Sequence, residues 1–83
     1  MTNPVQTVIT HSVPREERQA AIETLTEASR TTDLAVLVRV DGLPGGLRRQ
    51  AVDGLRSCEA GDLLEELADD RSIPPELRKK AQR

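Results

Sequence analysis

The chain has 83 residues, a formal net charge of −2 at pH 7 and 36% hydrophobic residues, with no Phe, Tyr or Trp. This length suits one small domain, and the lack of aromatic side chains excludes the stacking platforms that single-strand nucleic-acid binders use. The near-neutral charge excludes a global attraction to nucleic acid or membranes, and the sequence has no apolar run long enough to span a bilayer.

The first two predicted elements occupy residues 3–30. The segment 3–10, NPVQTVIT, has Val5, Val8 and Ile9 at helical spacing, which predicts a short amphipathic helix. After the breaker residues around Pro14, apolar residues at intervals of three and four predict a longer second helix on the stripe Ala21, Ile22, Leu25 and Ala28. Residues 3–30 therefore have the pattern of a helix–turn–helix unit.

The next two elements occupy residues 33–60. The segment 33–40, DLAVLVRV, is apolar at every position except Asp33 and Arg39. A helix that is apolar all round is buried on all sides, so we expect a central helix shielded by its neighbours. The β-branched residues leave a buried strand as the alternative, but there is no second strand-like run to pair with it. A longer helix follows on the stripe Leu47, Ala51, Val52, Leu55 and Cys58.

The last two elements occupy residues 62–83. The segment 62–70, DLLEELADD, is amphipathic, because its leucines fall on one face and its acidic residues on the other. The final helix has only Leu77 and Ala81 as apolar anchors, so the last unit is incomplete. We therefore expect an exposed apolar end beside Leu67 and Leu77 that supports self-association or docking.

Three columns of identical residues recur along the chain at an interval of 30 residues. They hold Pro14, Pro44 and Pro74; Arg18, Arg48 and Arg78; and Ala21, Ala51 and Ala81. Proline suits the first turn of a helix, where its missing N–H costs no hydrogen bond, and the apolar residue before it can fold back as a staple. The small Ala side chain allows two helices to approach closely. We expect each Arg to bridge one repeat to the next through an acid or a carbonyl oxygen.

The periodic units predict the fold class and the domain organisation. We expect an all-α fold of about six helices, in which three antiparallel helix hairpins form a short α-solenoid. The single domain, 1–83, divides into repeats at approximately 3–30, 33–60 and 62–83. Polar residues near the starts of the helices at 33–40 and 62–70 are the expected N-caps, namely Thr32, Asp33 and Asp62.

The segments ERQAAIETL (17–25) and LRRQAVDGL (47–55) carry Arg, two residues, Ala, and Leu four residues further on. This pattern resembles the second helix of HEAT-type repeats, in particular the short HEAT-like repeats first noted in phycobilin lyases. The resemblance covers nearly the whole chain and implies a right-handed stack of antiparallel helix pairs. Most members of that family are scaffolds and binding surfaces for proteins. Some bind duplex DNA along a basic concave face, and a few act in cofactor attachment or peptide hydroxylation.

Candidate chemical groups are few and isolated. His11 is the only histidine and Cys58 the only cysteine, so neither has the companions that a metal site or nucleophilic catalysis needs. We expect His11 at the solvent side of a helix end and Cys58 as a small buried hydrophobe. The loop GLPGG (42–46) lacks the Gly-Lys-Ser/Thr sequence of a phosphate-binding loop. The acidic residues between Glu59 and Asp70 form the pattern of a solvated face.

These patterns predict a non-catalytic protein–protein interaction module, such as an adaptor, a scaffold or a small regulatory protein. Catalytic residues, metal sites and cofactors are not expected, and the single cysteine favours a reducing, cytoplasmic compartment. The expected partner is another protein, with self-association through the C-terminal repeat as a further expectation. The alternative function, a nucleic-acid-binding repeat protein, has the net charge against it. The expected binding residues line the exposed side of the second helices: Arg15, Gln19, Arg49, Asp53, Arg56, Lys79, Lys80 and Arg83.

Overall fold

The computed structural model describes residues 3–82 and contains only helices and loops within that range. The helices are α1 (Pro4–Ile9), α2 (Arg15–Glu27), α3 (Thr31–Val38), α4 (Gly45–Ser57), α5 (Gly61–Ala68) and α6 (Pro75–Ala81). The all-α prediction is therefore confirmed. The ambiguous segment 33–40 is helical in its first six residues and contains no strand.

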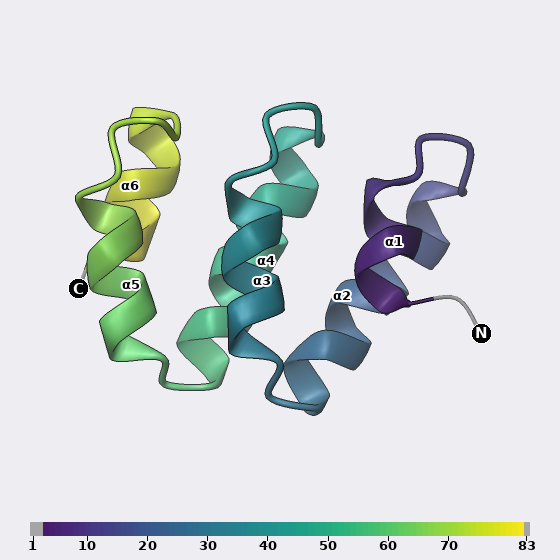
Figure 1. The fold of residues 1–83 in the computed structure, drawn as a ribbon, viewed down its shortest axis with the longest axis horizontal. Coiled ribbons are helices and arrows are strands. Elements are labelled where there is room, and N and C mark those ends of the chain that lie inside the picture. Colours follow the sequence, from purple (N-terminus) through teal and green to yellow (C-terminus); the bar gives the residue numbers. More distant parts are fainter. Residues whose placement is uncertain (1–2, 83) are drawn as a thin grey trace.

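The six helices lie in two layers (Figure 1). The helices α1, α3 and α5 form one layer, here called the odd layer, and α2, α4 and α6 form the even layer behind it. Each odd helix packs against the even helix that follows it in the chain, and α4 packs against both α2 and α6. The molecule is 33 Å long and 16 Å thick along its principal axes.

An aliphatic core fills the space between the two layers. Its largest fully buried side chains come from all six helices, and they include Val8, Ile22, Leu34, Leu47, Leu67 and Leu77. The burial of Leu67 and Leu77 contradicts the expected exposed apolar end, because α5 and α6 cover each other's apolar residues. The alanine column is buried as well, with exposed fractions of 9% at Ala21, 0% at Ala51 and 3% at Ala81.

Helix α3 is buried on three sides rather than on all sides. Leu34, Ala35, Leu37 and Val38 are buried, but Val36 is 47% exposed. The helices α1 and α5 flank α3 within the odd layer, and α4 lies behind it, so the outward direction stays open (Figure 1). A two-layer packing cannot shield the outer face of a central helix, and the expectation of complete burial is wrong for this reason.

The three column prolines lie one residue before their helices rather than in the first turn. Pro14, Pro44 and Pro74 have ψ of 146°, 141° and 147°, which is extended backbone. The carbonyl oxygen of each proline accepts hydrogen bonds from the N–H groups three and four residues later, so each still starts the helical hydrogen-bond ladder. Of the apolar residues before the prolines, Leu43 and Ile73 are buried, as expected for a staple.

The turns from α2 to α3 and from α4 to α5 have the same backbone geometry. Ser29 and Glu59, 30 residues apart, both lie in the left-handed region with φ of 55° and 56°. In each turn the N–H of the next residue bonds to a carbonyl oxygen five residues before it, at 2.9 and 3.0 Å. This hydrogen bond closes the end of a helix and reverses the chain within a few residues.

The abrupt turns explain why the predicted N-caps are wrong. Helices α3 and α5 begin at Thr31 and Gly61, directly after the reversal, and their N-cap positions are Arg30 and Ala60. Neither N-cap residue forms a side-chain capping bond. The predicted caps Thr32, Asp33 and Asp62 lie inside the first turns of these helices instead.

Two of the three column arginines are buried and bond to backbone. Arg18 and Arg48 donate from Nε to the carbonyl oxygens of Val8 and Val38, at 2.7 and 2.8 Å. Each bond joins the two helices of one pair, so the expectation that the column bridges one repeat to the next is wrong. The reason is that the last carbonyl groups of α1 and α3 have no partner inside their own helices. Arg78 is half-buried, and its Nε has no hydrogen-bond partner among the described residues.

Candidate functional site

The predicted binding residues that the structure describes all lie in the even layer. Arg15, Arg49, Asp53, Arg56 and Lys79 are exposed, whereas Gln19 and Lys80 are half-buried. Arg83 lies outside the described residues. The guanidinium of Arg15 lies over Gly46 at the start of α4, and so it connects the first turns of α2 and α4.

Two ion pairs between predicted binding residues and their neighbours join α4 to α6. Arg49 Nη1 lies 3.1 Å from Glu76 Oε1, and Lys80 Nζ lies 2.9 Å from Asp53 Oδ1. In each pair the partners are 27 residues apart, which is one repeat minus about one helical turn. That spacing is the sequence signal that could have identified both pairs. Exposed pairs of this kind stabilise only weakly, but they engage the charges that were expected to bind a partner.

Further polar contacts of the even layer run between side chains and backbone. Arg56 Nη1 donates to the carbonyl oxygens of Lys80 and Gln82 at 2.7 and 3.2 Å, and so it caps the end of α6. Gln50 Nε2 donates to the carbonyl oxygen of Gln19 at 3.0 Å, which joins α4 to α2. The predicted binding residues therefore largely hold the even helices together. Their role in binding a partner stays a prediction.

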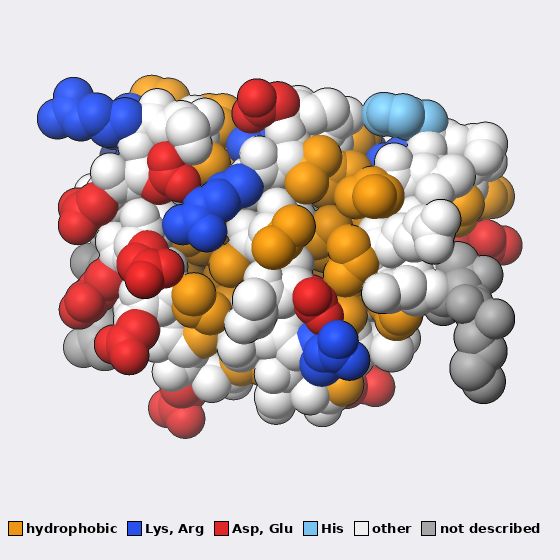
Figure 2. Space-filling model, viewed as in Figure 1, with side chains coloured by type: hydrophobic (Ala, Val, Ile, Leu, Met, Phe, Trp, Pro, Cys, Tyr) orange, Lys and Arg blue, Asp and Glu red, His pale blue; other side chains and the backbone are white. Residues whose placement is uncertain are grey.

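The odd layer carries an exposed apolar surface that the sequence did not reveal. Among the described residues, the exposed large hydrophobic side chains are Ile9 (41%) and Val36 (47%), from neighbouring helices of this layer. Half-buried Val5, Val40 and Leu63 pack against the core from the same layer or its loops. Figure 2 shows hydrophobic side chains gathered over α3 and between α3 and α1. This surface, which we call the odd-layer face, is the apolar side of the molecule.

Charge on the odd-layer face is concentrated on α5, where acidic side chains gather (Figure 2). Four exposed carboxylates of this segment form no ion pair within the described residues: Asp62, Glu65, Glu66 and Asp69. The cations flanking α3 are already paired. Arg30 lies 2.9 Å from Asp33, and Arg39 Nε lies 2.8 Å from Asp70 Oδ2.

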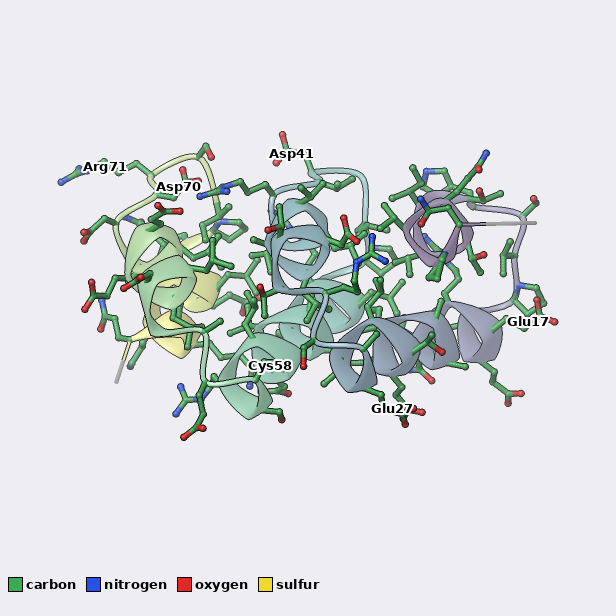
Figure 3. The ribbon with its side chains drawn as sticks, turned by 60° about the horizontal axis from the view of Figure 1, so that its bottom comes forward. Glu17, Glu27, Asp41, Cys58, Asp70 and Arg71 are labelled. Atoms are coloured by element: carbon green, nitrogen blue, oxygen red, sulfur yellow. The ribbon has the colours of Figure 1, made fainter. Side chains whose placement is uncertain are left out.

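Asp70 is the most strongly hydrogen-bonded carboxylate of the described chain. Its Oδ1 accepts from the Ser72 hydroxyl at 2.6 Å and from the Ser72 N–H at 2.9 Å, while Oδ2 accepts from Arg39. The bond from the Ser72 hydroxyl, followed by that from Arg39, lowers the pKa of Asp70 from 3.8 to about 2. Asp70 and Arg71 lie in the loop between α5 and α6, at the same edge as Asp41 in the loop before α4 (Figure 3).

The remaining candidate groups lie apart from one another. His11 is exposed in the loop after α1, as expected. Cys58 is half-buried rather than buried, because it ends α4, where its Sγ lies 3.3 Å from the carbonyl oxygen of Thr26. An open cavity of 410 Å³ lies between the ends of α4, α5 and α6, lined in part by Arg56, Glu59 and Glu65.

Residues 3–82 contain no group of three or more His, Cys, Asp or Glu side chains arranged to hold a metal ion. None of the described helices is both long enough and apolar enough to cross a membrane. Comparisons with models of protein families, with curated proteins and with solved structures found no match.

Proposed function

We propose that this protein is a non-catalytic protein-binding module and that its partner binds on the odd-layer face. We also propose that its helix pairs form a short right-handed α-solenoid of the HEAT-like type. The repetition of the turn at Ser29 and Glu59 and the contacts of α4 with both α2 and α6 support the solenoid. The proposal differs from the sequence expectation in the surface that it assigns to the partner.

The observation that carries the proposed function is the exposure of Val36 on the outer face of the central odd helix. Val36, which is 47% exposed, and Ile9 of the neighbouring helix α1, which is 41% exposed, both leave apolar area in water. Covering apolar area contributes about 25 cal/mol per Å², so a partner that covers this face gains binding energy. The fold does not need Val36 to be apolar, because this side chain points away from the core.

The nucleic-acid alternative has weaker support. Three of its expected cations are engaged, since Arg49 and Lys80 form ion pairs and Arg56 bonds to backbone carbonyl oxygens. The expected cations Arg15 and Lys79 are exposed and form no ion pair within the described residues. Binding of phosphates by Arg49, Lys80 or Arg56 would have to break their present contacts. A titration with random-sequence duplex DNA at low salt tests the alternative, and affinity that falls steeply with salt would support it over protein binding.

A site-specific photo-crosslinker at position 36, expressed in the native host, tests the proposed function. We expect a defined set of crosslinked proteins that is absent when the crosslinker replaces Glu23, which is exposed on α2 in the other layer. The captured protein must then bind the purified wild-type chain and fail to bind Val36→Asp, with both chains equally folded. Capture at position 23 and not at position 36 would contradict the proposal.

A further inference from the structure

The odd-layer face has a gradient of charge along its length. Helix α1, PVQTVI, has no charged residue, and the two arginines that flank α3 are both paired with aspartates. Helix α5 and its C-terminal cap carry the carboxylates of Asp62, Glu65, Glu66 and Asp69, which form no ion pair within residues 3–82. Arg71, in the loop that follows, is the one exposed arginine near this segment outside those ion pairs. The face is therefore apolar over α1 and α3 and negative over α5 (Figure 2).

We propose, building on the proposed function, that the partner presents a basic amphipathic helix to the odd-layer face. Its apolar side chains cover Val36 and Ile9, and its Lys or Arg side chains face the carboxylates of α5. A helix rises 1.5 Å per residue, so about 20 residues span roughly 30 Å. This length matches the 33 Å long axis along which α1, α3 and α5 are arrayed. The expected segment is apolar in one half and basic in the other.

A second copy of this chain is not a complementary partner for the odd-layer face. The described residues of the even layer contain no exposed large hydrophobic side chain, so contact of an odd layer with an even layer leaves Val36 without an apolar counterpart. Contact between two odd layers brings together faces on which the flanking cations are already paired and the α5 carboxylates are not. An odd–even contact supplies the cations of Arg15 and Lys79 without exposed large apolar side chains. An odd–odd contact supplies apolar side chains but only Arg71 as an arginine or lysine outside the ion pairs of the described residues. One such cation per copy does not match four carboxylates, and burying unpaired carboxylates is unfavourable.

The acidic half of the face also disfavours polyanionic partners. Duplex DNA and anionic membrane surfaces would meet the unpaired carboxylates of Glu65 and Glu66, and like charges at an interface oppose binding. The same carboxylates attract a basic segment toward the face and speed its association. They also repel acidic segments, so they favour basic partners over acidic ones. The charge gradient thus selects among protein partners as well as between classes of macromolecule.

Binding of designed peptides to the full chain tests the inference. The basic probe is a helical peptide of about 20 residues, with Leu on one face of its first half and Lys in its second half. Its acidic twin has Glu in place of every Lys. Isothermal titration gives the affinities, and amide shifts of the ¹⁵N-labelled chain locate the bound peptide. Zwitterionic vesicles serve as a third probe.

We expect the basic probe to bind at least about tenfold more tightly than its acidic twin, and to shift the amides of α3 and α5. The double variant Glu65→Lys with Glu66→Lys should weaken this binding about tenfold or more, and Val36→Asp should abolish it. The matched control reverses the same two charges on the other layer, at exposed Glu23 and Glu27 of α2, and should leave binding within about twofold. Glu27 projects from the even layer in Figure 3.

Four results would overturn the inference: no binding of the basic probe, equal binding of the acidic twin, shifts confined to the even layer, or binding of the vesicles instead of the peptide. Equal binding of both peptides with loss in Val36→Asp would reject the basic partner while the proposed binding face stands. Failure of the crosslinking at position 36 would reject the face itself. Circular dichroism of each variant confirms that the chain remains folded.

Discussion

The guanidinium of Arg48 lies 2.8 Å from the carbonyl oxygen of Val38, inside a core that has no aromatic side chain. Arg48 is only 5% exposed, so its charged donor satisfies a helix-end carbonyl that water does not reach easily. Hydrogen bonds to charged groups contribute about 1.5–3 kcal/mol, and the arginine stem also packs against apolar residues. This contact ties α4 to α3 at the end where the loop 39–44 connects them.

Arg48→Ala should therefore lower the free energy of unfolding by about 2–4 kcal/mol, because it removes the bond to Val38 and leaves a cavity. Urea unfolding followed by circular dichroism measures the change. The control Arg49→Ala removes an exposed side chain from the next position and should cost less than about 1 kcal/mol. Equal losses of unfolding free energy in the two variants would show that the buried hydrogen bond of Arg48 does not stabilise the fold.

Gly54 and Gly46 form a matched pair on α4 for testing close helix packing. A Cβ at Gly54 would meet Thr26 Oγ1 of α2 and lie 3.2 Å from Leu34 Cδ1 of α3. Thr26 is a short side chain held by its bond to the Ile22 carbonyl oxygen, so it cannot move away easily. Gly54→Ala should therefore destabilise the protein by about 1–2 kcal/mol despite the higher helix propensity of Ala.

Gly46→Ala should have the opposite sign. The nearest atoms to its added Cβ belong to the Arg15 guanidinium, the far end of a flexible and exposed side chain. The guanidinium can swing aside, and the gain in helix propensity should raise stability by up to about 1 kcal/mol. Thermal unfolding of both alanine variants beside the wild type checks the pair, and a gain at Gly54 would mean that α2 and α4 are further apart than described.

Glu59 has a left-handed backbone conformation that glycine adopts more easily. A non-glycine residue in this conformation destabilises the folded state by about 1–2 kcal/mol. Replacing it with Gly removes this cost, but the greater freedom of Gly in the unfolded chain cancels part of the gain. Glu59→Gly should raise stability by about 0.5–1 kcal/mol in a thermal melt. Glu23→Gly, in the interior of α2, should lower it by about 1 kcal/mol. A loss at both positions would argue against the left-handed turn.

Asp70 gives the protein a defined dependence on pH. Its pKa in the folded chain is about 2, below the ordinary 3.8, so the folded state favours the ionised form. The stability that this provides is fully present above about pH 4 and is lost as the pH falls toward 2. Asp70→Asn should therefore lose less stability than the wild type when the pH falls from about 4 toward 2. The urea concentration at the unfolding midpoint, measured at several pH values, gives this dependence. Asp69→Asn, a change at the adjacent carboxylate, should keep it.

The helices could be predicted from the sequence because the 30-residue period places Pro, Arg and Ala in phase with local helical spacing. The Ile22 and Leu25 stripe and its counterparts identify the core for the same reason. The helix starts at 3, 33 and 62 were predicted to within two residues, but the N-caps of α3 and α5 could not be predicted. The left-handed residues at the turns are Ser29 and Glu59 rather than Gly, so the residue that usually marks this kind of helix end is missing from the local sequence.

The candidate site was harder to predict than the fold. Val36 is an apolar residue of the kind found in cores, so the sequence suggests that it is buried. It faces water because the described fold has only two layers and none of its helices covers the outer side of α3. The charged residues of the even layer are of the kind found on binding surfaces, namely Arg49, Asp53 and Lys80. The register between α4 and α6 instead places Arg49 against Glu76 and Asp53 against Lys80 within the chain. Both outcomes depend on how neighbouring helices are arranged. Hydrophobic periodicity within one helix does not carry that information.

The matching turns at Ser29 and Glu59 have a consequence for engineering. Residues 31–60 begin and end at equivalent points of the same reversal, so a tandem duplicate of this segment would leave each junction with its original backbone geometry. Such a longer chain would gain one odd and one even helix, and one more outward-facing valine. The length of the molecule would then become an adjustable parameter for the design of elongated binders.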